Sequence, residues 1–265
     1  MEGELADMLK LFVSDIDGTL MNARKEITEE DVQAIKEASR LGVAICLASG
    51  RMYEEITKVM EVLDTACYAV CQNGATIIGL DGEVLRSNVF ASELALSLQA
   101  ATKLPGFVPV ICSSDCNYVL HATEHTERVG RRFLTPLQEN PQLVDEIQNG
   151  LAVTKFSIYG EIPDLEALLK QLQEQYGDQI TASFSDPDGI DVMPNGVDKG
   201  AGIRLLMEHI GVSADGVACI GDSFNDLAMF RACEQSFAMS HSPQAIREEA
   251  AFVADTVGSA IKRLL

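Results

Sequence analysis

Short apolar runs alternate with amphipathic stretches at the beginning of this chain. The apolar runs cover residues 9–13, 43–48 and 67–71, and each is followed by polar residues and a glycine. The stretches between them repeat apolar residues at helical spacing, as in Val32, Ile35, Ala38 and Leu41, which follow a sequence resembling a capping box, Thr28-Glu29-Glu30-Asp31. Near-continuous apolar strands separated by helices are typical of a parallel sheet covered on both faces. We therefore predict strand, helix, strand, helix, strand over residues 9–71.

The pattern changes in the middle of the chain. We predict a hairpin over residues 76–89, because Asp81-Gly82 is a favoured two-residue turn. Beyond it, strands and helices mix without regular alternation: helices are predicted over 92–103, 124–133 and 165–176, and strands on both sides of 113–116 and over 154–159. A mixture of this kind indicates an inserted α+β domain.

The first pattern returns from Asp198 onward. Apolar residues at helical spacing lead to the buried run 217–220, and a helix over 225–232 and a strand over 237–239 follow. We therefore predict an α/β protein with a Rossmann-like, doubly wound parallel sheet that is split in sequence. Residues 1–82 and 190–265 would form this core domain, and residues 83–189 the inserted α+β cap domain.

Charge and hydropathy exclude several kinds of partner. The 265 residues are 47% hydrophobic and 23% charged, and the net charge is −20. Binding to nucleic acid or to an anionic membrane surface depends on Lys and Arg, so we expect neither. The chain has no apolar run of about 18 residues, and its acidic start, MEGELADMLK, is unlike the basic start of a signal peptide. We expect a cytoplasmic protein.

Seven cysteines are an odd number, and several lie in apolar runs, so we expect reduced core residues. One group has the ligand types that zinc favours: Cys112, Cys116, His121 and His125. The expected strand over 117–120 would splay these side chains apart. A zinc site and a chance grouping both stay open, with the spacing favouring chance.

Four polar segments end or adjoin the predicted strands, namely residues 15–19, 49–51, 198–200 and 221–226. Ligands of open α/β sheets bind beyond the carboxyl ends of the strands, so we expect these segments to meet in one crevice. Asp15 and Asp17 stand one residue apart where the first strand ends, which is where a nucleophile and a proton carrier are expected. Taken alone, they are explained equally well as a solvated acidic turn.

Together, the four segments suggest magnesium chemistry. Carboxylates on separate loops suit Mg²⁺, which keeps some of its water and accepts phosphate oxygens. A carboxylate that attacks a phosphate dianion meets repulsion of ~4 kcal/mol per charge pair at ~4 Å and an effective dielectric of ~20. Mg²⁺ and Lys199 would offset that repulsion.

Five motifs occur in the order DIDGTL, ASGR, QNGA, DVMPNGVDKG and GDSFNDLAMF. In this order they resemble the haloacid dehalogenase superfamily, specifically its Cof-like sugar-phosphatase branch with a large type IIB cap. The resemblance covers essentially the whole chain, and five motifs in register are far more specific than any one of them.

The resemblance implies a role for each motif residue. Asp15 would be the nucleophile that forms an aspartyl-phosphate, and Asp17 the general acid and base. Ser49 and Lys199 would hold and stabilise the transferring phosphoryl group. The remaining expected roles are metal binding by Asp15, Asp17, Asp222 and Asp226, with Asp226 alternatively orienting the metal shell, and phosphate or substrate binding by Gly18, Thr19, Gly50, Asn73 and Asn225. Arg51 fits a structural ion pair as well as a functional role.

Simpler explanations exist for single residues. Asp222 and Asp226 could complement a helix dipole, Lys199 could be solvated, and Ser49 could be a helix cap. The chain also departs from the family where Ser240-His241-Ser242 replaces the common Gly-Asn-Ala, which puts the rim of the substrate pocket in doubt. The polar cap residues expected to contact the leaving group are Arg86, His121, Arg131, Arg132 and Lys155.

We therefore predict a Mg²⁺-dependent phosphatase whose partner is a small phosphorylated metabolite such as a sugar phosphate. A phosphomutase or a dedicated sucrose- or trehalose-phosphate phosphatase would share the same core. A non-hydrolytic binding protein would not need Asp17. The sequence names neither the leaving group nor the oligomeric state.

Overall fold

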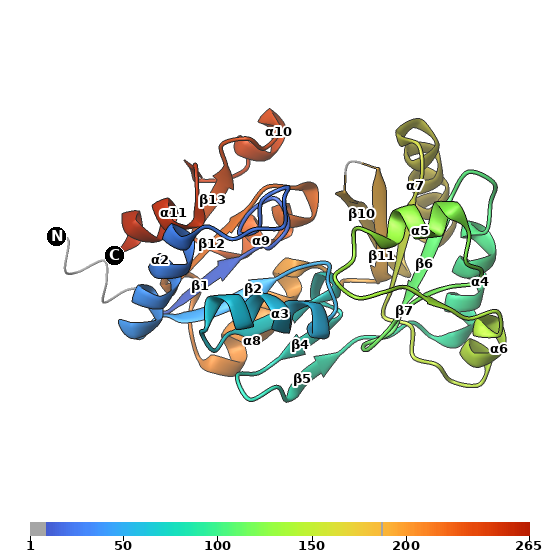
Figure 1. Ribbon diagram of the computed structural model, residues 1–265, viewed down its shortest axis with the longest axis horizontal. Coiled ribbons are helices and arrows are strands. Elements are labelled where there is room, and N and C mark those ends of the chain that lie inside the picture. Colours follow the sequence, from blue (N-terminus) through green and yellow to red (C-terminus); the bar gives the residue numbers. More distant parts are fainter. Residues whose placement is uncertain (1–8, 187) are drawn as a thin grey trace.

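The computed structural model describes residues 9–186 and 188–265. Residues 1–8, which carry most of the acidic N-terminal segment, lie outside this description. Two sheets lie side by side, each covered by helices (Figure 1). The first contains eight strands in the order β14-β13-β12-β1-β2-β3-β4-β5, and the second six strands in the order β10-β11-β9-β6-β7-β8.

The first sheet is built from both ends of the chain. Its strands are β1 (Leu11–Ser14), β2 (Ala44–Ala48), β3 (Tyr68–Cys71), β4 (Thr76–Ile78), β5 (Val84–Ser87), β12 (Val217–Gly221), β13 (Gln235–Met239) and β14 (Phe252–Ala254). The strands from β14 to β3 are parallel, and β4 and β5 add an antiparallel edge. Ser14 is in register with both Leu47 and Ile220. The predicted doubly wound parallel sheet is therefore confirmed, with the ends of β1, β2 and β12 at one edge.

Alternate side chains of β1 enter two different cores, as the period of two in a strand requires. Phe12 packs with residues of three helices on one face: α2 (Glu29–Arg40), α3 (Tyr53–Leu63) and α11 (Val257–Leu264). Leu11 and Val13 pack on the other face against α8 (Lys199–Ile210) and α9 (Leu227–Ala232). The strand is buried on both faces, which explains its continuous apolar run.

The second sheet lies in the middle of the chain. Its strands are β6 (Val108–Cys112), β7 (Asn117–Val119), β8 (Gln138–Glu139), β9 (Lys155–Tyr159), β10 (Ile180–Asp186) and β11 (Gly189–Pro194). Its helices are α4 (Ser92–Thr102), α5 (Glu124–Gly130), α6 (Leu143–Gln148) and α7 (Ile162–Tyr176). Phe156 and Ile158 of β9 pack under α4, α6 and α7. Lys155, Ser157 and Tyr159 therefore point to the opposite face of the sheet.

The chain passes between the two sheets close to the expected boundaries, residues 83 and 190, but not at them. Strand β5 pairs with β4 in the first sheet, and β11 pairs with β9 and β10 in the second. By hydrogen bonding, the crossings therefore come after Ser87 and after Pro194. The helix expected over 124–133 ends at Gly130, and the loop that follows contacts the first sheet's helices. No described helix is both long and apolar enough to cross a bilayer.

Candidate active site

Asp15 lies directly after β1 and is almost completely buried. One of its carboxylate oxygens, Oδ1, accepts a hydrogen bond from Lys199 Nζ at 2.6 Å. The other, Oδ2, is buried and has no hydrogen-bond partner. Burial raises the pKa of Asp15 well above its usual value; Lys199 opposes this shift, while the nearby charges of Asp226 and Asp222 add to it. The free oxygen is thus held dry beside a cation.

Lys199 is the first residue of α8, not part of a loop. Asp198 caps this helix by accepting a hydrogen bond from the backbone of Ala201 at 2.6 Å, so the lysine leaves the helix start toward the strand ends. Its ammonium group is fully buried and also donates to Asp226 Oδ1 at 2.7 Å. Burial lowers the pKa of Lys199, but Asp15 and Asp226 more than offset this and raise it above its ordinary value. Lys199 is therefore a permanent cation.

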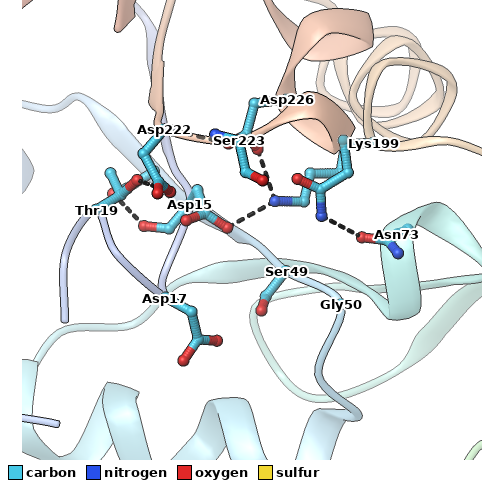
Figure 2. Close-up of polar contacts among 12 residues, drawn as sticks. Asp15, Asp17, Thr19, Ser49, Gly50, Asn73, Lys199, Asp222, Ser223 and Asp226 are labelled. Carbon is cyan, nitrogen blue, oxygen red and sulfur yellow. Dashed lines mark hydrogen bonds and ion pairs between the residues drawn. The ribbon is translucent and has the colours of Figure 1, made fainter. Parts of the chain in front are cut away.

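Asp226 and Asp222 occupy different positions around Lys199 (Figure 2). The second oxygen of Asp226 accepts hydrogen bonds from the backbone N–H groups of Asp222 and Ser223, at 2.8 and 3.0 Å. Both oxygens of Asp226 are thus engaged. Asp222 accepts from Thr19 Oγ1 at 3.0 Å, and burial together with the charge of Asp226 raises its pKa to about 6.

Gly18 is required next to Asp222 for two reasons. Its φ of +81° favours glycine, and a Cβ built at this position would lie 2.5 Å from Asp222 Oδ2. A side chain here would displace the carboxylate. The closeness of the DIDG turn to Asp222 explains why the glycine follows the two acids.

Asp15, Asp222 and Asp226 offer carboxylate oxygens that lie within 4.8 Å of one another. Asp15 Oδ2 is a buried acceptor without a donor, and the donor set is entirely oxygen, as Mg²⁺ prefers. These residues fit a magnesium ion. In the part of the chain that the structure describes, this is the one such group of His, Cys, Asp and Glu, so Cys112, Cys116, His121 and His125 do not gather into a site.

Asp17 points away from the Asp15 carboxylate (Figure 2). Its two oxygens accept hydrogen bonds from Arg51, at 2.7 Å from Nε and 2.6 Å from Nη2. Arg51 also pairs with buried Glu55 at 3.3 Å. The structural ion pair that the sequence left open for Arg51 is therefore present, and its partner is the expected acid and base.

Ser49, Gly50 and Asn73 lie together where β2 and β3 end. The backbone N–H of Asn73 donates to the carbonyl of Ser49 at 2.9 Å, and Asn225 Nδ2 donates to Asn73 Oδ1 at 3.2 Å. Asn73 is in the left-handed region, with φ of 55°, which asparagine tolerates better than most residues. The structure therefore gathers all of the phosphate-binding residues predicted from the sequence at one edge of the sheet.

A buried network joins this edge to the second sheet. Lys155 of β9 donates to the carbonyl of Gly50 at 2.7 Å and to Asp191 Oδ2 of β11 at 3.0 Å. The same Asp191 oxygen accepts from Asn73 Nδ2 at 2.7 Å, and its other oxygen accepts from Ser157 at 2.6 Å. Sequence reasoning missed Asp191, although it lies in the DVMPNGVDKG motif, because nothing local reveals its partners.

A second set of contacts ties the loop after α5 to the first sheet's helices. Glu55 accepts from the backbone of Leu134 at 2.5 Å, Lys58 donates to the carbonyl of Leu134 at 2.8 Å, and Lys25 donates to the carbonyl of Arg131 at 2.8 Å. The sequence gave no signal for Lys25 or Glu55, since their partners are backbone groups far along the chain.

A cavity of 790 Å³ lies between the two sheets. It is lined by Asp15, Asp17, Ser49 and Asp222 from the first sheet's side, and by Arg132 and Lys155 from the cap. The other expected cap residues, Arg86, His121 and Arg131, are exposed and are not among the described residues that line it.

A doubly wound sheet that gathers three aspartates around a buried lysine, beneath an inserted α+β cap, defines an α/β enzyme with a covered active site. The chain belongs to the haloacid dehalogenase-like hydrolase family, whose model matches residues 12–260. The resemblance stated from the motifs is thereby confirmed.

Relatives share the whole chain at low identity. An HMP-PP phosphatase of Shigella boydii is 26% identical over 250 residues, which are 91% of this chain and 92% of that protein. The chloroplastic endoribonuclease YBEY of Arabidopsis thaliana is 26% identical over 259 residues, but this chain spans only 43% of its length.

Solved structures show the same fold. The Thermotoga maritima protein TM0651 matches with a TM-score of 0.83 and 25% identity, covering 97% of both chains. A sugar phosphatase described as HAD subclass IIB, BT4131, matches with a TM-score of 0.81 and 20% identity, over 97% of this chain and 100% of that one. At this identity the second match establishes the fold alone.

Proposed function

We propose that this protein is a Mg²⁺-dependent phosphatase that hydrolyses small phosphate monoesters through an aspartyl-phosphate on Asp15. The observation that carries the proposal is the state of the Asp15 carboxylate. One oxygen is held by Lys199, and the other is buried without a partner next to Asp222. An acid kept dry beside a fixed cation suits attack on phosphorus.

The chain's own residues account for both halves of the reaction. Asp15 Oδ2 would form a bond to phosphorus while the bond from phosphorus to the ester oxygen breaks, and protonated Asp17 would give its proton to the leaving alkoxide. Asp17 would then take a proton from a water whose oxygen attacks the aspartyl-phosphate. This releases phosphate and restores the Asp15 carboxylate.

Two positions must be explained for these steps. Asp17 is bound by Arg51 and points away from Asp15, so it would exchange Arg51 for the leaving oxygen when substrate binds. Ser49 and Lys199 would hold the phosphoryl oxygens, with Gly18, Thr19, Gly50, Asn73 and Asn225 around them. We assign Asp226 to orienting Lys199 and the Asp222 loop, because both of its oxygens are engaged.

Mg²⁺ would be held by Asp15 and Asp222, with the carbonyl of Asp17 as a further expected ligand, and when bound it would neutralise charge on the transferring phosphoryl group. Residues 1–82 and 190–265 are proposed as the core domain and 83–189 as the cap. The relatives named as an HMP-PP phosphatase and a sugar phosphatase support a small phosphorylated substrate. A cytoplasmic location stays a prediction.

The test is hydrolysis of p-nitrophenyl phosphate with and without Mg²⁺ by the wild type, Asp15→Asn and Asp17→Asn. We expect Asp15→Asn to abolish turnover, Asp17→Asn to reduce it by about 10²–10⁴-fold, and chelation of Mg²⁺ to stop it. Circular dichroism of each variant controls for folding. Unchanged phosphate release in Asp15→Asn would refute the proposal, and a purely binding protein would show no turnover with any protein sample.

A further inference from the structure

The cavity between the sheets has a wall that the phosphoryl chemistry does not use. Besides the carboxylates and Ser49, its lining includes a set of large apolar side chains and one proline: Phe133, Tyr159, Ile162, Phe184, Phe224 and Pro243. They come from both sides of the cavity, two from the core and four from the cap.

Phe224 is the most unusual of these residues. It follows Asp222-Ser223 directly, so the same turn that places the acidic residue also places the ring at the cavity. Its side chain is 47% exposed, and it is the one aromatic residue among the large, well-exposed apolar side chains of the described chain. An exposed apolar side chain that lines a cavity beside catalytic groups is typical of a ligand-binding surface.

The cap faces Phe224 with further rings. Strand β10, which carries Phe184, packs against the turn that carries Phe224. Phe133 and Tyr159 contact each other edge to face, with their centroids 6.2 Å apart at 76°, which fixes both rings. Ile162, at the start of α7, is 49% exposed and lines the same cavity. The leaving group of a substrate would therefore meet aromatic and aliphatic surfaces on two sides.

The charged groups of this cavity are already engaged with one another. Lys155 bonds Asp191 and the Gly50 carbonyl, Arg51 bonds Asp17 and Glu55, and Arg132 pairs with Asp188. A polyhydroxylated leaving group needs several donors and acceptors, and each hydroxyl left without one costs affinity. Among the described lining residues outside these pairs and the catalytic groups, the polar side chains that face the apolar set are few: Glu166, Ser185 and His241.

The geometry points to a substrate whose leaving group is a flat aromatic ring joined to the phosphate through a short alcohol, held between Phe224 on the core and Phe184 on the cap. This inference rests on the proposed function and narrows its substrate class. The polar side chains at the rim, Glu166, Ser185 and His241, would contact polar atoms at the edge of the ring. An aromatic ring gains from offset or edge-to-face contact, which a saturated ring of the same size does not offer.

The test compares benzyl phosphate with cyclohexylmethyl phosphate, whose leaving alcohols are both primary and similar in size, and with glucose 6-phosphate. We expect kcat/KM for benzyl phosphate to exceed that for each of the other two by about tenfold or more. In Phe224→Leu and Phe184→Leu, which keep an apolar side chain without the ring, the ratio of benzyl to cyclohexylmethyl phosphate should fall severalfold. Leu104→Ala, an exposed apolar cap residue outside the cavity, should leave the ratio unchanged.

Failure of this inference differs from failure of the proposed function. Hydrolysis of all three esters with a ratio near one, or with glucose 6-phosphate preferred, would overturn the aromatic leaving group and leave the phosphatase standing. If no ester is hydrolysed, calorimetric binding of benzylphosphonate against cyclohexylmethylphosphonate decides the inference by itself. Tighter binding of the aromatic phosphonate, weakened in Phe224→Leu, supports it, and equal or absent binding overturns it.

Discussion

Single residues of the active site owe their positions to contacts made far away in the sequence. Asp15 is held by Lys199, and Thr19 contacts Asp222, which lies 203 residues along the chain. A local pattern can suggest that such residues are functional, because acids, glycine and strand ends occur together. It cannot show that Asp226 has both oxygens engaged, or that Asp17 is paired with Arg51, because those facts depend on the folded geometry.

Gly18 offers a direct test of the Asp222 position. We expect Gly18→Ala to reduce phosphatase activity by at least about 100-fold and to weaken its Mg²⁺ dependence, because the new methyl group must displace the Asp222 carboxylate. Activity titrated against Mg²⁺ measures both effects. Gly42→Ala is a matched control, since its φ of +89° imposes the same backbone strain with nothing within 4 Å of the added carbon. Equal losses in the two variants would show that strain alone is responsible.

The cysteines provide a second residue-level prediction. All seven are buried, and burial raises the pKa of both Cys67 and Cys112 to about 12. At pH 8 the thiolate fraction of such a group is only about one part in ten thousand, because a raised pKa keeps the thiol protonated. We therefore expect a chromogenic disulfide reagent to label none of them rapidly in the folded protein and all seven in denaturant. Fast labelling of Cys67 in the native state would contradict this placement.

At the scale of elements, the sequence predicts regular alternation well and the cap poorly. The strands of the parallel sheet are buried on both faces, so their apolar runs identify them without knowledge of their neighbours. The hairpin of β10 and β11 was not predicted, because Ile180–Asp186 contains small and polar residues whose strand geometry depends on pairing with β11. Asp191 was missed for the same reason, since its partners Lys155 and Asn73 are 36 and 118 residues away.

The ion pair of Lys155 and Asp191 joins the cap to the phosphate-binding turn. Their side chains are 5% and 4% exposed. We expect Lys155→Met to lower the free energy of unfolding by about 3–5 kcal/mol, because it leaves a buried carboxylate without its cation. It should also raise KM for phosphate esters more than it lowers kcat, since Gly50 loses a fixed contact. Denaturant unfolding and steady-state kinetics measure the two effects.

Two further variants separate these effects. Lys155→Met/Asp191→Leu should recover part of the lost stability, because no unpaired charge remains. Lys58→Met removes another bond between core and cap, at an exposed site away from the phosphate-binding turn, and should change KM little. A similar rise of KM in Lys58→Met would mean that cap docking in general, not the buried pair, sets substrate affinity.

At the scale of the whole molecule, the charge of −20 opposes the arrival of an anionic substrate. We expect kcat/KM for a phosphate ester to rise about two- to threefold when NaCl increases from ~10 to ~100 mM, because the screening length shortens from ~30 to ~10 Å. Choline chloride should act like NaCl if the effect is electrostatic screening. A steady decrease with either salt would show that attraction by cations such as Lys199 already dominates at long range.

The turn at Gln72, Asn73 and Gly74 connects all of these scales. All three residues have positive φ, at 49°, 55° and 98°. Gln72 donates to the carbonyl of Ser113 in the cap at 2.6 Å, Asn73 donates to Asp191, and Gly74 leaves room for the backbone of Asp198, just before the catalytic lysine. A chimera that receives a foreign cap must therefore also receive an acceptor opposite Gln72 and a carboxylate opposite Asn73. Exchange of substrate range between such enzymes will succeed only when this three-residue junction is transplanted together with the module it serves.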